Sequence, residues 1–249
     1  MVPKFPYRTP DFTWDERTPI ITVRDLNKVF TLASGDVQVL KHVNLEMEKG
    51  EFVGIVGRSG CGKSTLVNMI TGIDHPSSGE VTVAGQPLQA LNEGKLSEWR
   101  GRTLGIVFQF FQLLPTLTLI ENVMLPMDFC RMFPPAEREE RARQLLARVG
   151  LEKEANKFPG AVSSGQQQSA AVARALANDV PILVADEPTG NLDSRSAEEI
   201  IQLFQELVAQ GKTILMVTHD LDLAQRTDRI IHMSDGVIVP RLIAEGAQP

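Results

Sequence analysis

Cysteine, excess positive charge and long apolar segments are all scarce in this sequence. Its 249 residues contain two cysteines, Cys61 and Cys130, which excludes a disulfide framework and fits a reducing compartment. Lysine and arginine total 25 against 31 aspartate and glutamate residues, and the resulting net charge of -6 gives no overall basic field of the kind that attracts nucleic acid. We therefore expect no nucleic-acid partner.

A membrane-spanning helix and a secretory signal are also missing from the pattern. Residues 104–120 form an uncharged run of 17 residues, but the run contains glutamine, proline and threonine, and a spanning helix needs about 20 mainly apolar residues. We expect a buried strand followed by an apolar loop there. Residues 1–19 contain four prolines and no apolar signal core, so we interpret them as an extended arm, and residues 241–249 as a tail.

Short apolar segments alternate with helical patterns along residues 20–240. The run "EFVGIVG" ends in glycine and leads directly into a helical pattern over 63–73. Such alternation predicts an α/β protein with a parallel sheet covered by helices. Two earlier segments, "IITVRDLNKVF" and "VQVLKHVNLEM", have the alternation typical of antiparallel strands. The sequence thus predicts a parallel α/β core preceded by an antiparallel β unit.

Strand patterns stop between residues 134 and 177. The stretch "PPAEREERARQLLARVG" begins with proline, has apolar residues on one helical face and reaches a stop signal at Gly150. It should form an amphipathic helix. We infer a helical insertion at about residues 112–168 that interrupts the sheet-forming sequence.

A phosphate-binding loop is the strongest motif. "GRSGCGKST" matches G-x-x-x-x-G-K-[ST] between a predicted strand and a predicted helix. Its glycines let backbone N–H groups converge on phosphate oxygens, Lys63 neutralises the β- and γ-phosphates, and Ser64 is suited to bind Mg²⁺. We interpret Cys61 as a small residue at a permissive position, although the helix dipole there would favour a redox role. The residues predicted to bind the nucleotide phosphates here are Gly57, Arg58, Ser59, Gly60, Cys61, Gly62, Lys63, Ser64 and Thr65.

Polar groups follow two further apolar strands. "PILVADEPTG" ends its strand with Asp186 and Glu187, at the edge where such sheets place their ligands. Asp186 suits Mg²⁺ through a water, because this ion favours carboxylate oxygens and retained waters. Glu187 suits polarising an attacking water as general base. His219, after "TILMVT", is placed to bind a γ-phosphate or orient the water, although a lone histidine is more often structural.

These motifs, in this order, resemble the ATP-binding-cassette family from about residue 20 to 240. The stretch "VSSGQ" at 162–166 is similar to the signature motif of that family, usually Leu-Ser-Gly-Gly-Gln. The resemblance implies a P-loop NTPase (RecA-like) core with an N-terminal antiparallel β subdomain and an inserted α-helical subdomain. It also implies that two cassettes pack head to tail, with each ATP between the phosphate loop of one subunit and the signature of the other.

Further site residues come from this resemblance. Gln109 matches the glutamine loop, a catalytic and metal-binding position, and Phe30 matches the aromatic residue that stacks on adenine, although Phe30 could equally belong to the core. Asp193 ends the matching "GNLD" stretch. The signature residues that would contact the ATP of the other subunit are Ser163, Ser164, Gly165 and Gln166.

Two positions depart from the usual signature. Ser164 stands where glycine is common, so its side chain would crowd a close backbone approach. Ser169 stands where arginine commonly follows the three glutamines, which removes a cation from the helix. The departures affect the expected turnover rate rather than ATP binding, whose main contacts come from residues 57–65.

The stretches "FQFFQLLPTLTLIENV" and "EPTGNLDS" resemble the branch that contains macrolide-exporter, lipoprotein-releasing and cell-division cassettes. This implies an ATPase subunit at the cytoplasmic face of the membrane that forms a homodimer on ATP and drives a separate membrane-spanning permease to export or extract a substrate. Apolar residues beside Gln109 suggest a docking groove for that partner, unless they are internal to the insertion. These residues are Phe110, Phe111, Leu113 and Leu114.

Other functions stay open within the same chemistry. One is a cassette that transmits force to a partner outside the membrane without transport, and another is a weakly hydrolysing ATP clamp, which the two unusual serines favour. A soluble cassette working on nucleic acid or ribosomes fits less well, because the chain has one cassette, two cysteines and an acidic charge. The transported substrate and the identity of the permease are not encoded in these residues.

Overall fold

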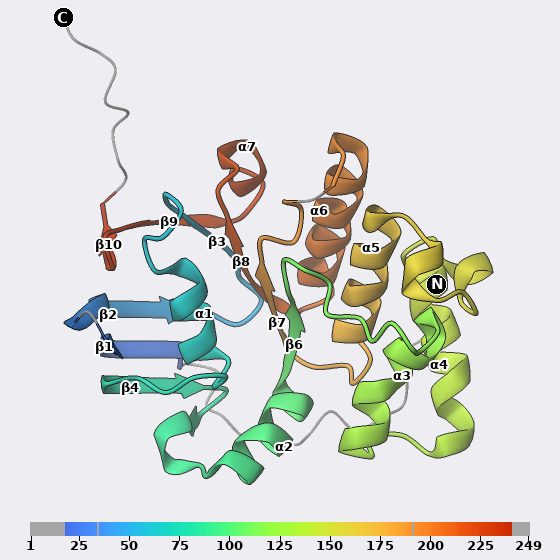
Figure 1. Ribbon diagram of the computed structural model, residues 1–249, viewed down its shortest axis with the longest axis horizontal. Coiled ribbons are helices and arrows are strands. Elements are labelled where there is room, and N and C mark those ends of the chain that lie inside the picture. Colours follow the sequence, from blue (N-terminus) through green and yellow to red (C-terminus); the bar gives the residue numbers. More distant parts are fainter. Residues whose placement is uncertain (1–17, 34, 191, 241–249) are drawn as a thin grey trace, which may run out of the picture.

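The computed structural model describes residues 18–33, 35–190 and 192–240. The predicted tail 241–249, and all but the last two residues of the predicted arm 1–19, lie outside these ranges. Two β-sheets and their surrounding helices make up the described part, with an antiparallel sheet at one side of the molecule and a group of helices at the other (Figure 1).

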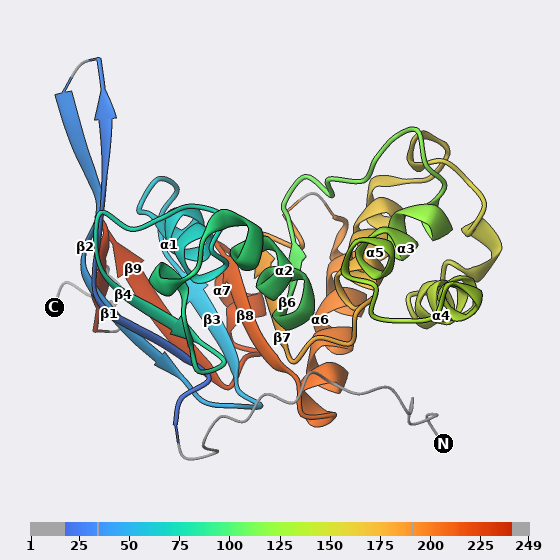
Figure 2. The same ribbon diagram turned by 90° about the horizontal axis from the view of Figure 1, so that it is seen from below.

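The antiparallel sheet has the strand order β2-β1-β4-β5. Its strands are β1 (Ile21–Leu32), β2 (Gly35–Met47), β4 (Ser78–Val83) and β5 (Gln86–Pro87). Apolar residues at alternating positions bury one face of this sheet against the main core, because successive side chains of a strand point to opposite faces. The predicted antiparallel pair is confirmed, and its hairpin extends beyond the rest of the molecule (Figure 2).

The central sheet has the strand order β10-β9-β3-β8-β7-β6, in which only β10 runs antiparallel to its neighbour. Its strands are β3 (Phe52–Val56), β6 (Leu104–Val107), β7 (Ile182–Asp186), β8 (Thr213–Thr218), β9 (Arg229–Ser234) and β10 (Val237–Val239). Val56 pairs with Thr218, and Asp186 pairs with Val217. The loops after β3, β7 and β8 therefore leave the sheet at one edge.

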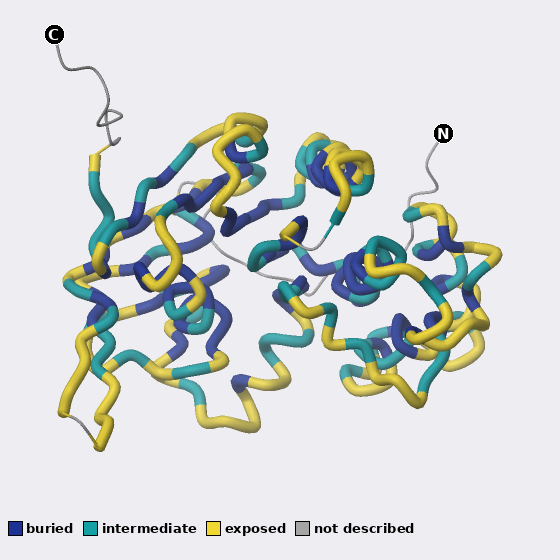
Figure 3. Tube along the Cα trace, turned by 45° about the horizontal axis from the view of Figure 1, so that its top comes forward, coloured by how far each residue is buried: buried dark blue, intermediate teal, exposed yellow. Residues whose placement is uncertain are grey.

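Alternate residues of the central strands face two different layers. On β8, Leu215 and Val217 join the core that contains α1 (Lys63–Ile70) and the antiparallel sheet. Ile214 and Met216 point the other way, into a core shared with α6 (Ser194–Ala209). Burial on both faces explains why these strands read as continuous apolar runs. Figure 3 shows the buried residues concentrated along these strands and on the inner faces of the helices.

A second group of helices packs around its own apolar cluster beside β6 (Figure 1). The group consists of α3 (Leu119–Cys130), α4 (Pro135–Arg148) and α5 (Ser164–Ala175). The predicted amphipathic helix is α4, and it ends just before Gly150, whose φ of +74° suits a helix stop. α5 runs through residue 168 without a break, so the division into a core and an insertion at 112–168 stays a prediction.

The uncharged run of residues 104–120 forms β6 and a loop, as expected, but its last two residues begin α3. The remaining helices are α2 (Glu93–Thr103), α7 (Leu221–Ala224) and short 3₁₀ turns at Leu88–Ala90, Glu152–Glu154 and Pro159–Ala161. The sequence did not predict α2, because only Leu96 and Thr103 of that helix are buried and no apolar stripe marks it. Within the described ranges, no helix is both long and apolar enough to cross a bilayer.

Replacing Phe204 by alanine should lower the free energy of unfolding by about 3–5 kcal/mol. Phe204 is fully buried on α6, and its ring meets the edge of Phe52 with the centroids 6.2 Å apart. Truncation leaves a cavity between helix and sheet. Urea unfolding of Phe204→Ala would measure the loss, with Phe158→Ala as the control, because Phe158 is 52% exposed. Equal and small losses in both variants would contradict this packing.

Candidate functional site

The phosphate-binding loop connects β3 to α1 by a tight turn. A side chain at Gly57 would meet the Met233 carbonyl oxygen at 2.2 Å, and Gly62 has a φ of +104°, so both positions require glycine. The Lys63 side chain is buried, and its ammonium donates hydrogen bonds to the carbonyls of Gly57 at 2.7 Å and Arg58 at 3.0 Å. Two backbone carbonyls of the loop thus hold the buried ammonium group of Lys63 in place.

A cavity of about 460 Å³ opens in front of this loop. It is lined by Val39, Ser59, Gly60, Gly62, Lys63, Ser64, Thr65, Gln109, Glu187 and His219. The structure therefore brings the loop, the glutamine after β6, the acidic strand end and the histidine after β8 into one place. Val39 is a lining residue that the sequence analysis missed, because nothing distinguishes it from the other apolar residues of β2.

Three predicted residues frame this cavity without lining it. Gly57 lies at the back of the loop, Arg58 is exposed, and Cys61 is buried with its sulfur 4.0 Å from the Lys63 ammonium. Their contribution to the loop is through the backbone, which sets its curvature.

Asp186 ends β7 with a carboxylate oxygen, Oδ1, that is buried and has no hydrogen-bond partner. Burial raises the pKa of this carboxyl, and the charge of Glu187 raises it further, whereas a hydrogen bond with Ser64 and the charge of Lys63 lower it. An unsatisfied buried carboxylate oxygen is costly unless a cation or proton compensates it. The Asp186 and Ser64 oxygens are the hard ligands that Mg²⁺ favours, so the residues present fit this ion.

Glu187 and His219 form a hydrogen-bonded pair across the ends of β7 and β8. The distance between Glu187 Oε2 and His219 Nδ1 is 2.7 Å, and the side chains are 12% and 66% exposed. Glu187 has a φ of +49°, and its backbone N–H donates to the Val217 carbonyl at 2.9 Å. A non-glycine residue held in this conformation costs about 1–3 kcal/mol and is typical of functional sites. The strained turn directs a largely buried carboxylate toward the cavity.

Gln109 lies two residues beyond β6 and reaches the same space. A side-chain carbon built on Gly190 would lie 3.9 Å from both Gln109 Nε2 and the β-carbon of Glu187. The glutamine side chain and the acidic turn are therefore neighbours, although nearly eighty residues separate them in the sequence.

The signature stretch forms the start of α5. Ser163 is the N-cap: its hydroxyl accepts a hydrogen bond from the Gln166 N–H at 3.2 Å, and its own N–H donates to Gln166 Oε1 at 3.0 Å. This reciprocal pair is a capping box. None of Ser163, Ser164, Gly165 and Gln166 lines the cavity of about 460 Å³.

Two other predicted residues also lie outside the cavity lining. Phe30 is 37% exposed on β1, with the Lys28 ammonium 4.8 Å from its ring centre. Asp193 is the N-cap of α6, and its carboxylate accepts hydrogen bonds from the N–H groups of Arg195 and Ser196. Two hydrogen bonds from Ser196 lower the pKa of the Asp193 carboxyl. The bond from the backbone N–H of Ser196 has the larger effect, and the bond from its hydroxyl has the next largest. Within one chain, the structural role of Asp193 is therefore to cap the N-terminus of α6.

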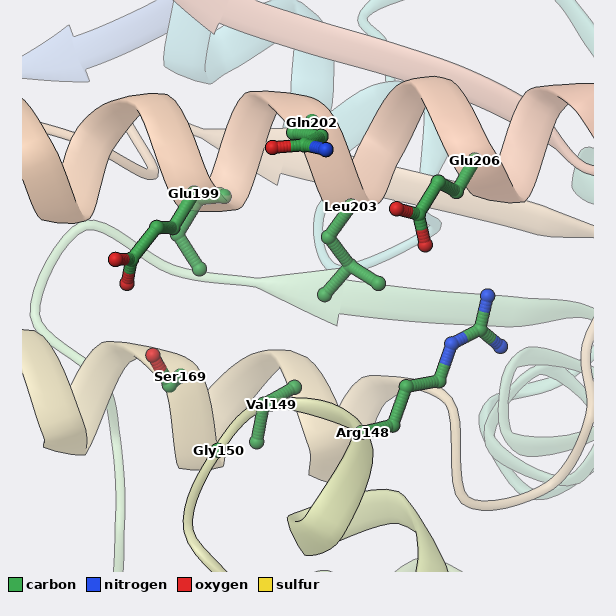
Figure 4. A pocket seen from close by; sticks show the side chains of 9 residues that line it. Arg148, Val149, Gly150, Ser169, Glu199, Gln202, Leu203 and Glu206 are labelled. Atoms are coloured by element: carbon green, nitrogen blue, oxygen red, sulfur yellow. The ribbon is translucent and has the colours of Figure 1, made fainter.

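A crevice of about 290 Å³ separates α5 from α6 at Ser169. Figure 4 shows Ser169 and Glu199 on opposite sides of this crevice, with Arg148 extending toward Glu206. Glu199 forms an ion pair with Arg195 of its own helix at 3.1 Å. The small serine therefore leaves a space bordered by two carboxylates where a longer cationic side chain would fit.

An apolar groove of about 610 Å³ lies on the β6 side of α5. Leu114 lines it, whereas Leu113 packs into the helical cluster and Phe110 is 68% exposed without lining the groove. The predicted apolar residues are thus divided among the groove (Leu114), the helical cluster (Leu113) and the solvent-exposed surface (Phe110). Phe129, which is 79% exposed and lines the groove, was missed because a lone aromatic residue at a helix end gives no sequence signal.

The fold and this cavity define a P-loop nucleoside triphosphatase, because a glycine loop, a buried lysine and an acidic strand end meet at one edge of a parallel sheet. The family model described as "ABC transporter" matches residues 40–190. The chain belongs to the ABC transporter family, as its ATP-binding, ATP-hydrolysing type of subunit.

Relatives agree with this assignment. The lipoprotein-releasing system ATP-binding protein LolD of Syntrophotalea carbinolica is 46% identical over 220 residues, which is 88% of this chain and 96% of that protein. The macrolide export ATP-binding/permease protein MacB of Burkholderia lata is 44% identical over 223 residues, which is 90% of this chain but 32% of that protein. The chain thus spans about a third of the length of that exporter.

Solved structures show the same fold. The dimeric structure of a post-hydrolysis state of the ATP-binding cassette MJ0796, bound to ADP and Pi, superposes with a TM-score of 0.84 at 41% identity. It covers 88% of this chain and 97% of that one. The predicted fold class and the predicted ABC-type ATPase are confirmed.

Replacing Ser169 by arginine should raise the melting temperature by about 1–3 °C, because a surface ion pair with Glu199 contributes about 0.2–1 kcal/mol and the side-chain stem fills the crevice. Differential scanning calorimetry would measure the shift. Ser169→Gln is the control of similar length without charge. An unchanged melting temperature, or a gain that survives Glu199→Gln, would contradict the pairing.

Proposed function

We propose that this chain binds ATP with Mg²⁺ in the cavity of about 460 Å³ and hydrolyses the γ-phosphate bond there. The observation that carries this proposal is the meeting of Lys63, Gln109, Glu187 and His219 around one cavity, beside an unsatisfied oxygen of Asp186. Backbone N–H groups of residues 57–65 and the N-terminus of α1 face the phosphates, and Lys63 supplies the positive charge.

Magnesium is assigned to Ser64, Asp186 and Gln109. These residues would hold the ion, which would offset the negative charge that develops on the phosphate during hydrolysis. The Ser64 hydroxyl is available from the first turn of α1, and Asp186 supplies its buried oxygen through a water. Gln109 lines the same cavity as Ser64 and lies beside the acidic turn, so its amide oxygen would complete the set.

Glu187 would act as the general base for the attacking water. Its carboxylate is largely buried and fixed by the strained turn, so it faces the γ-phosphate position in one orientation. His219 donates to or accepts from Glu187 at 2.7 Å and keeps the carboxylate there. The exposed face of the imidazole would then be the part that touches the γ-phosphate.

A second copy of the chain would complete the site. In our proposal, Ser163, Ser164, Gly165 and Gln166 supply N–H and hydroxyl groups at the N-terminus of α5 to the ATP of the partner. Two observations support this: these residues do not line the cavity of their own chain, and the related cassette MJ0796 forms a dimer with ADP and Pi. Phe30 would stack on adenine, and Asp193 would be a further ATP-binding residue.

The proposed partner beyond this dimer is a separate membrane-spanning permease, with no nucleic acid involved. The apolar groove with Phe129 and Leu114 offers a docking surface, and the relative MacB is named as both an ATP-binding and a permease protein. We place the chain at the cytoplasmic face of the membrane, where closure on ATP would drive export or extraction of a substrate.

Two alternatives keep the same site. Force transmission without transport would use the same groove and differ only in what the partner does. A weakly hydrolysing clamp is favoured by Ser164, whose side chain is exposed at the first residue of α5, where the γ-phosphate of the partner would approach. Restoration of turnover by Ser164→Gly, measured as steady-state phosphate release, would select the clamp.

Replacing Glu187 by glutamine should trap an ATP-bound dimer, because the amide cannot take a proton from water while the phosphate contacts stay intact. Size-exclusion chromatography with ATP and with ADP would detect the dimer. Lys63→Ala should stay monomeric in ATP, since it loses the main side-chain cation of the phosphate site. A monomeric Glu187→Gln variant with full activity would overturn the assignment of the base.

Replacing Asp186 by asparagine should raise the magnesium concentration needed for half-maximal hydrolysis by about 10–100-fold. The charge on the proposed metal ligand is lost, while the loop that binds the phosphates is unchanged. A titration of Mg²⁺ at fixed ATP would measure the shift. Asp220→Asn is the control, because Asp220 caps α7 through its side chain. An unchanged magnesium requirement in Asp186→Asn would refute the metal assignment.

A further inference from the structure

Arg174 joins the signature helix to the loop that follows Gln109. Its Nη2 donates to the Phe111 carbonyl at 2.7 Å, and its Nη1 donates to the Gln112 carbonyl. The planar guanidinium thus holds two successive carbonyls at once, a geometry that lysine cannot reproduce. Hydrogen bonds from a charged donor are about twice as strong as neutral ones. One side chain of α5 therefore fixes the path of the loop at its sharpest point.

The loop that Arg174 holds is strained. Phe111 has a φ of +36° and Gln112 a φ of +53°, and neither is glycine. The Gln112 N–H bonds back to the Phe110 carbonyl, which closes a three-residue turn around Phe111. This conformation is unfavourable for residues other than glycine, and it persists only where the surrounding structure holds it. The two hydrogen bonds from Arg174 hold Phe111 and Gln112 in this conformation.

The strained turn sits between two functional surfaces. Gln109, at its start, lines the ATP cavity, and Gln112 and Arg174 themselves line the apolar groove. Arg174 lies on the same helix as the signature residues, and the ten positions from Ser164 to Arg174 correspond to about 15 Å of helix. A movement of α5 or an occupant of the groove would therefore reach Gln109 through Arg174.

We propose that Arg174 is a positioning residue for ATP hydrolysis, which holds Gln109 in the cavity by clamping the carbonyls of Phe111 and Gln112 to α5. This inference rests on the proposed role of Gln109. It assigns to Arg174 no contact with ATP, so its removal should lower kcat and leave ATP affinity unchanged. It also makes the clamp the link between the groove and the site.

Arg141 provides a matched control within the same helical group. Its Nε donates to the Ala177 carbonyl at 2.6 Å, and its guanidinium lies 4.5 Å from the ring centre of Phe133. Arg141 is thus also an arginine that binds backbone carbonyls near the end of α5, but those carbonyls do not belong to the loop. Loss of Arg141 should reduce stability without moving Gln109.

The test compares Arg174→Met, Arg174→Lys and Arg141→Met in the full chain. Amide hydrogen exchange of residues 108–113 is measured without nucleotide, and kcat, KM and the dissociation constant for ATP are measured on the same samples. Arg174→Met should speed exchange in 108–113 and lower kcat by at least about tenfold, with ATP affinity within about twofold of the parent chain. Arg141→Met should leave both loop exchange and kcat unchanged.

Several outcomes would overturn the inference. These are unchanged exchange in 108–113, a kcat of Arg174→Met equal to that of the parent, or an equal loss of kcat in Arg141→Met. If Arg174→Met does not fold, Arg174→Lys provides the test, because lysine keeps the positive charge but lacks the planar guanidinium. Hydrogen-exchange protection of residues 108–113 and a kcat that are both intermediate would support the clamp. Protection and kcat equal to those of the parent chain would refute it. Absence of hydrolysis in the parent chain would instead count against the proposed function, while loop exchange still tests the clamp.

Discussion

The hydrogen-bond register of the central sheet is the constraint on which the site depends. The pairing of β3 with β8 and of β8 with β7 fixes three carboxyl ends at one edge, where Val56, Asp186 and Thr218 are the last residues. The loops that follow these strands begin with Gly57, Glu187 and His219, all of which belong to the proposed site. A shift of one residue in either pairing would turn every side chain of the shifted strand to the opposite face and separate Lys63 from the acidic turn.

The two-sided burial of these strands links the site to its surroundings. Residues on one face pack with α1, which carries the phosphate loop, and residues on the other face pack with α5 and α6, which carry Ser163 and Asp193 at their starts. The helices α3 and α4 belong mainly to a separate cluster. The loop between β6 and α3 therefore connects two packed bodies, and Arg174 restrains it from the side of α5.

Much of the site could be predicted because its motifs are local. The phosphate loop, the acidic strand end and the start of α5 are each contained in fewer than ten residues, and the backbone geometry of each follows from glycine, capping residues or strand alternation. The clamp of Arg174 on Phe111 could not be predicted, because the two residues are 63 positions apart. The same holds for the crevice at Ser169, whose far wall lies on α6. Asp193 could be predicted in part. An aspartate before a helix is visible in the sequence as a capping residue, but the sequence does not show that its carboxylate binds the start of α6.

The charges around the cavity explain why nucleotide and metal would bind together. Lys63 is a buried cation, and it faces two adjacent carboxylates at Asp186 and Glu187. A triphosphate bound there without a metal would add several negative charges beside these carboxylates. Neighbouring like charges repel strongly where the local dielectric constant is low. In the proposed function, a divalent cation at Asp186 would offset that repulsion and would compensate the buried Oδ1, which has no hydrogen-bond partner in the chain. The carboxylate of Glu187 is paired with His219 and would then serve as the proposed base for the attacking water.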